Sequence, residues 1–187
     1  MTMGYLVTAK TPMAWRGPMA GGALQQMLTQ TNWGELDVLV VDMPPGTGDI
    51  QLTLAQKAEV AGAVIVTTPQ DIALLDAKKG IEMFTKVKIP VLGIVENMAV
   101  HICSQCGQED SIFGAGGGES VAEQYSTQLL GSLPLDRNIR ERGDQGMPSV
   151  IAEPEGKIAQ SYREIAVKVL EQLAGEGGDS GPEIVFE

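Results

Sequence analysis

The sequence predicts an α/β fold in which a mostly parallel sheet is covered by helices. Short aliphatic, β-branched runs alternate with longer stretches in which apolar residues recur every three or four positions, and this alternation is typical of such a sheet. Of the 187 residues, 43% are hydrophobic and 4% aromatic, which predicts an aliphatic core. We expect one domain over residues 1–174 and a disordered, acidic, glycine-rich tail over 175–187.

Three aliphatic runs, at 38–41, 63–66 and 91–95, predict buried strands. Because parallel strands end at the same edge of a sheet, the loops that follow Val66 and Val95 should converge with the loop after the first run. Function is expected at that edge.

Apolar stripes predict the helices that cover the sheet. The stripes consist of Ala20, Leu24, Met27 and Leu28; of Leu74, Ala77, Ile81 and Phe84; and of Ile158, Tyr162, Ile165, Val169 and Leu173. The last helix should begin near Pro154 and end at Gly175, and another should begin near Glu119 or Ser120. These stripes are interpreted as core faces.

The net charge of −11 argues against binding of nucleic acid or of an anionic membrane as the main function of the chain. No apolar run reaches the roughly 18 residues that a bilayer span needs, and the first ten residues do not resemble a signal peptide. The default expectation is a soluble cytoplasmic protein.

A carboxylate follows the first predicted strand and opens a stiff, glycine-containing turn that runs from Asp42 through two prolines and Gly46 to Asp49. Such an Asp can hold Mg²⁺ through water, and such a glycine lets a backbone N–H approach a terminal phosphate. The alternative is a strand that ends in a Pro-Gly turn whose Asp caps the next helix.

Cys103 and Cys106 are the two cysteines of the chain and form a C-x-x-C pair, which indicates metal ligands or a redox pair. A 4Fe-4S cluster or a tetrahedral zinc site generally takes four ligands, so one chain supplies two. A two-fold dimer would supply all four. The pattern is compatible with a bridging cluster, with structural zinc and with a thiol–disulfide pair. His101 is either a further ligand or a solvated loop residue.

These motifs, in this order, resemble the Mrp/ApbC-type iron–sulfur cluster carrier proteins, relatives of the MinD and ParA P-loop ATPases. The resemblance covers Met3 to about Ala174. It is carried by the blocks 3–7, 15–19, 42–49, 67–70, 93–98 and 131–135 and by the cysteine pair. It implies a P-loop NTPase-like fold of the SIMIBI type and a homodimer bridged by a 4Fe-4S cluster. It also implies delivery to apo iron–sulfur proteins, with ATP and Mg acting in the complete protein.

The resemblance also implies that Asn97 contacts the edge of an adenine and that Pro134 packs beside the same base. Considered without the resemblance, Asn97 is a turn residue and Pro134 is a strand terminator. The family's G-K-G-G-V-G-K-[ST] phosphate loop does not occur in the 187 residues. We therefore expect the C-terminal part of a longer protein, incomplete at its N-terminus, which alone neither binds ATP tightly nor hydrolyses it.

Two other functions share parts of this pattern. A ParA/MinD-type partitioning or positioning ATPase has the fold and the Asp42 turn, but it needs no C-x-x-C pair and the acidic C-terminus is no membrane helix. A redox module would place the cysteines at a helix N-terminus after a first strand.

The glycines at 113–118 follow no predicted strand, which argues against a dinucleotide site. Asp71 is expected to cap a helix, and the charged residues at 137–142 to form a solvated helix face.

Overall fold

The computed structural model describes residues 17–44, 48–103 and 105–176. Gly46, the motif block at 3–7 and residues 177–187 of the predicted tail lie outside the described residues. The chain divides into two compact units, Met1–Val60 and Ala61–Glu187, and each is described by itself. The expectation of one domain over 1–174 stays a prediction.

The first unit contains two helices that pack on each other, α1 (Gly17–Gln30) and α2 (Asp49–Lys57). Ala20 and Leu24 of α1 and Leu54 of α2 are buried, so the apolar stripe predicted for α1 is confirmed as a core face. Gly21 permits the close approach of the helices, because a Cβ at this position would lie 3.0 Å from Oγ1 of Thr53.

The strand predicted at 38–41 is not formed, and the prediction is wrong for this segment. Its backbone is irregular and three of its four side chains are exposed, with Val40 at 86%. A strand of a parallel sheet takes its backbone hydrogen bonds from its neighbours, and 38–41 forms no ladder with any strand of the described residues. An aliphatic run alone therefore did not suffice to make a strand.

The second unit is built on a parallel sheet with the order β1-β2-β5. The strands are β1 (Ala63–Thr67), β2 (Val91–Glu96) and β5 (Leu129–Ser132), and both pairings of the central strand β2 are parallel. The strands predicted at 63–66 and 91–95 are confirmed. β2 is the most buried strand, because both of its faces are covered.

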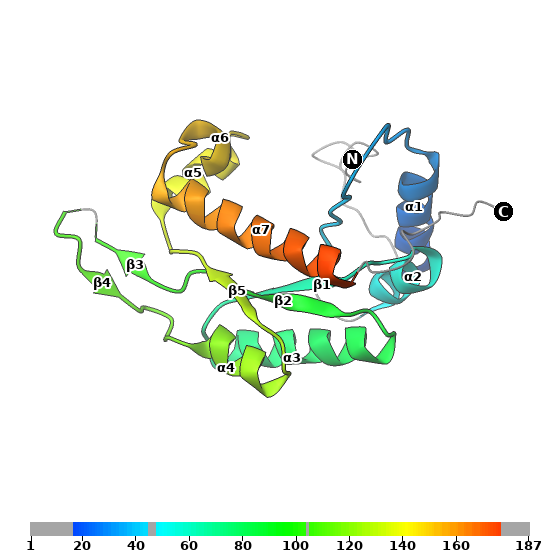
Figure 1. Cartoon of the computed structure of the whole chain (residues 1–187), viewed down its shortest axis with the longest axis horizontal. Helices are drawn as coiled ribbons and strands as arrows, with labels where there is room; N and C mark the ends of the chain where they lie inside the picture. The colour runs from blue at the N-terminus through cyan, green and yellow to red at the C-terminus, as the bar shows by residue number, and fades with distance from the viewer. Residues whose placement is uncertain (1–16, 45–47, 104, 177–187) are drawn as a thin grey trace. The chain divides into compact units, whose positions relative to one another are not determined.

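Helices cover the two faces of this sheet (Figure 1). One face packs on α3 (Asp71–Lys86) and α4 (Gly117–Gln124), and the other on α7 (Lys157–Glu176). The first core contains Ile65, Ala77, Ile81, Ile94, Val121 and Ala122; the second contains Val95, Leu130 and Leu133 against Tyr162, Ile165 and Val169. Neighbouring residues of β2 thus point to opposite layers, as strand geometry requires. The predicted mostly parallel sheet flanked by helices is confirmed.

A short antiparallel hairpin extends from the carboxyl edge of the sheet (Figure 1). It consists of β3 (His101–Ile102) and β4 (Glu109–Asp110). Two small helices, α5 (Arg137–Asp144) and α6 (Ser149–Ala152), connect β5 to α7. Within the described residues, no helix combines the length and apolar character that crossing a membrane requires.

Candidate functional site

The cysteine pair lies in the turn of the β3–β4 hairpin. Cys103 follows β3, donates its backbone N–H to the Gln108 carbonyl at 2.9 Å and accepts from the N–H of Gly107 at 2.8 Å. Gly107 has φ +72°, a left-handed conformation that closes the turn and favours glycine. Both thiols are free; Cys103 is half-buried and Cys106 is exposed. The structure therefore brings the two predicted ligands together in one C-x-x-C-G turn, called the cysteine turn below (residues 103–107).

Hydrogen bonds within the cysteine turn lower the pKa of the Cys103 thiol below its usual value of 9.0. The largest cause is the hydrogen bond from the Gln105 backbone, followed by those from the backbone and the side chain of Cys106. Desolvation opposes the shift, and the charge of His101 adds a smaller lowering. Donors aimed at the sulfur favour the thiolate, which is the form that binds metal.

His101 is directed to the root of the hairpin. Its Nδ1 lies 3.1 Å from the carbonyl oxygen of Leu135, and this contact links β3 to the segment after β5. In the tautomer that carries the proton on Nδ1, this nitrogen donates to the carbonyl. The alternative of a solvated loop residue is wrong, because His101 lies in β3, is half-buried and contacts the Leu135 carbonyl.

The donor set of the cysteine turn fits half of a tetrahedral thiolate site. Among residues 17–44, 48–103 and 105–176 there is no group of three or more His, Cys, Asp or Glu side chains placed to hold a metal ion. Two thiols in a closed turn match two of the four ligands that zinc or an iron–sulfur cluster takes. Within the described residues, the cysteine turn thus supplies two of four ligands.

Asn97 and Pro134 lie at the same edge of the sheet, because they follow the parallel strands β2 and β5. Asn97 follows β2 and donates its N–H to the Thr67 carbonyl at 2.7 Å, while Leu133 donates to the Glu96 carbonyl at 2.8 Å. The side-chain Oδ1 of Asn97 accepts from the N–H of the next residue at 2.9 Å. This last bond is that of a turn residue, so the structure supports that role of Asn97 and leaves its role at an adenine a proposal.

Glu96 is a buried structural carboxylate that the sequence did not reveal. It is the last residue of the central strand, is 4% exposed, and its carboxylate accepts a hydrogen bond from the N–H of Gly118. The N-cap of α4 is Gly116, which has no side chain to accept this bond. Glu96 therefore caps α4 from the sheet. The signal in the sequence is a lone carboxylate at the end of an otherwise aliphatic strand.

The residues of the predicted magnesium turn belong to the first unit. Asp42 is exposed, and Asp49 is the first residue of α2. The N-cap of α2 is Gly48, so neither Asp fills the capping position considered as an alternative. The buried side chain of Gln51 donates to the Pro44 carbonyl at 2.8 Å and fastens the start of the turn to α2.

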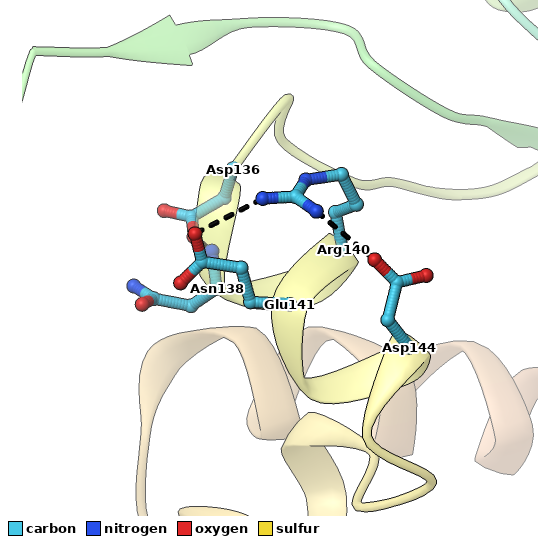
Figure 2. A network of polar contacts seen from close by, with 5 residues as sticks. All are labelled: Asp136, Asn138, Arg140, Glu141 and Asp144. Carbon is cyan, nitrogen blue, oxygen red and sulfur yellow. Dashed lines mark hydrogen bonds and ion pairs between the residues drawn. The ribbon is translucent and has the colours of Figure 1, made fainter.

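Other charged residues singled out by the sequence have structural roles. Asp71 begins α3 but the N-cap is Gln70, so Asp71 acts through its charge in the first turn. Figure 2 shows the polar network of α5, in which Arg140 pairs with Asp144 at 2.9 Å and with Glu141 at 3.0 Å. The expected solvated helix face is confirmed for Arg137 and Arg140, which are exposed, whereas the Arg142 side chain is 27% exposed and pairs with Glu153 at 2.9 Å.

Solved structures that resemble the chain define the class of its fold as that of the P-loop NTPases. A nucleotide-binding protein from Archaeoglobus fulgidus, solved with ADP, is 40% identical with a TM-score of 0.63, covering 73% of this chain and 55% of that one. The cell-division ATPase MinD of Pyrococcus furiosus has a TM-score of 0.59 at 22% identity over 83% of this chain and 59% of its own. The MinD likeness shows the fold alone.

The chain belongs to the ParA family described as NUBPL iron-transfer P-loop NTPase, whose sequence model matches residues 1–170. It is 65% identical to the iron–sulfur cluster carrier protein of Pseudomonas fragi, over 89% of this chain and 58% of the relative. It is 50% identical to the iron–sulfur cluster transfer protein NUBPL of Mus musculus, over 92% and 54%. The chain spans about half the length of these curated relatives. The family resemblance inferred from the motifs is confirmed.

Proposed function

We propose that this chain carries an iron–sulfur cluster between the cysteine turns of two copies and delivers it to apo iron–sulfur proteins. The observation that carries the proposal is the cysteine turn itself, which presents two free thiols on a hairpin and supplies half of a four-ligand site. The names of the relatives agree with this role. A 4Fe-4S cluster bridging a homodimer satisfies the ligand count.

The chemistry of delivery follows from the exposure of the turn. The hydrogen bonds that lower the pKa of Cys103 favour its thiolate, so this residue is suited to hold an iron of the cargo. Cys106 is exposed, so a thiolate of the receiving protein can approach the same iron. Transfer is then ligand exchange: the incoming thiolate binds iron as a cysteine thiolate leaves, with no change in electron count. The cytoplasm, where thiols stay reduced, suits this cargo.

Nucleotide binding belongs to the proposal for the longer protein of this family. Asp42, Gly46 and Asp49 would serve Mg²⁺ and the terminal phosphate of ATP, and Asn97 and Pro134 would contact the base. The 187 residues contain no G-K-G-G-V-G-K-[ST] loop to cradle the phosphates, so we derive no step of delivery through ATP. A MinD-type positioning role is supported at the level of the fold alone.

The test is anaerobic loading with iron and sulfide, followed by mixing with an apo 4Fe-4S protein whose activity reports cluster arrival. We expect loading and transfer by the unmodified chain and loss of both in Cys103→Ser and Cys106→Ser. His101→Asn serves as the control and should retain iron, because Nδ1 of His101 contacts the Leu135 carbonyl. Iron that stays bound after both cysteines are replaced would contradict the proposal.

A further inference from the structure

Beside the hairpin lies a cleft of about 590 Å³ that the proposed function does not use. It is bounded by the start of α3 and by the glycine-rich segment between β4 and α4, here called the glycine segment (residues 112–117). A Cβ at Gly117 would lie 2.8 Å from Cδ1 of Leu74, so the glycine segment packs closely on α3. Figure 1 shows that this segment leads directly from the hairpin to α4.

The cleft has a mixed polar and apolar lining, and exposed apolar side chains continue from it onto α3. Pro69, Leu74, Ile112 and Phe113 line it. Ile112 is 54% exposed, and outside the cleft Ile72 and Leu75 of α3 are 77% and 58% exposed. Leu75 lies one turn after the lining residue Asp71 on the same helix face. Exposed apolar side chains that extend past a cleft favour a protein segment over a small ligand, which would leave the α3 side chains in water.

The charges around the cleft select the partner. Four exposed carboxylates lie in the lining or within a few residues of it along the chain: Asp71 in the lining, Glu109 and Asp110 on β4, and Glu119 in the first turn of α4. None of the four forms an ion pair with a residue of the described segments, and the lining contains no Lys or Arg. Exposed carboxylates next to the exposed side chains of Ile112, Ile72 and Leu75 complement a segment with basic residues next to apolar side chains.

One polar atom in the lining also lacks a partner. Oε1 of Gln70 is buried and has no hydrogen bond to the described residues. A buried acceptor without a donor is costly, and a backbone N–H of a docked segment would satisfy it.

We infer that this cleft, with Ile72 and Leu75, docks a basic segment of the receiving protein whose apolar side chains cover Ile112, Ile72 and Leu75. The inference rests on the proposed function for the identity of the partner. Ile112 lies two residues after β4, at the root of the hairpin whose turn contains Cys103, so docking here holds the receiving protein at the base of the hairpin that carries the cysteine turn. Such proximity raises the rate of ligand exchange without a new contact to the cargo.

The test uses a fluorescein-labelled peptide of alternating leucine and arginine, with binding read by anisotropy on the full chain. Ile112→Ser should weaken binding about tenfold or more, as expected when one buried aliphatic side chain is lost. Ile151→Ser on α6 is the matched control, because Ile151 is also exposed, at 67%, and lies on another element. Asp71→Asn should weaken binding and reduce its salt dependence.

Three results would overturn the inference: no binding of the leucine–arginine peptide, equal binding of a serine–arginine peptide, or equal weakening by Ile151→Ser. Iron loading measured on the same variants separates this inference from the proposed function. Ile112→Ser should load iron as the unmodified chain does, whereas failure of the unmodified chain to load iron would contradict the carrier role and leave the peptide result standing.

Discussion

Replacing Gly107 by alanine isolates the backbone geometry of the cysteine turn. Gly107 has φ +72°, and among the described residues no atom outside its neighbours lies within 4 Å of the position that a Cβ would occupy. The substitution therefore adds no clash, and its cost is that of a left-handed alanine, about 1–2 kcal/mol. If metal binding requires the closed turn, this cost appears as an affinity for metal that is about five- to thirty-fold weaker.

Titration with Co²⁺ measures this affinity through the absorption bands of the thiolate complex. Gly143→Ala in α5 is the control, because Gly143 also has open space for a Cβ but no left-handed φ. We expect Gly143→Ala to bind Co²⁺ as the unmodified chain does. Unchanged Co²⁺ affinity in Gly107→Ala, with normal circular dichroism, would refute the reasoning that the closed turn is the binding conformation.

Three further predictions concern individual residues. Because the pKa of Cys103 is lowered in the fold, its alkylation rate should reach half-maximum at a lower pH in the folded chain than in urea; an equal or higher midpoint would contradict the hydrogen-bonding account. Glu96→Ala should lower the free energy of unfolding by about 1–3 kcal/mol in urea titrations, because the buried N–H of Gly118 loses its acceptor, whereas Glu96→Gln keeps an acceptor and should cost less. Lys88→Gly should raise that free energy by up to about 1 kcal/mol, because Lys88 has φ +60° after the end of α3; a loss of stability would show that its side chain matters more than its backbone.

The strands that the sequence predicted correctly are those whose aliphatic residues are also buried in the folded chain. Residues 91–95 are aliphatic or glycine and lie in the central strand, where both faces are covered. The segment 38–41 has the same pattern, but Val40 is exposed, because the pattern does not report whether a neighbouring strand pairs with it. β5 was not listed among the predicted strands, since its four residues include a glycine and a serine.

The part of the candidate site that could be predicted is the part in which the residue type itself indicates the chemistry. Cys103 and Cys106 stand out by spacing alone, and the structure places them in one turn. The hairpin that presents them was not predictable, because strands of two residues such as Glu109–Asp110 have no periodic pattern. Glu96 was missed for a different reason: its partner Gly118 is 22 residues away, so the contact exists only in the folded chain.

The stoichiometry of the loaded chain tests the central claim most directly. Native mass spectrometry after anaerobic loading should show two chains with about four iron and four sulfide ions, as one bridging 4Fe-4S cluster requires. Cys103→Ser and Cys106→Ser should each abolish this species. A single chain that retains a complete cluster, or a double cysteine variant that retains iron, would contradict the account that each copy contributes its two thiols to one shared site.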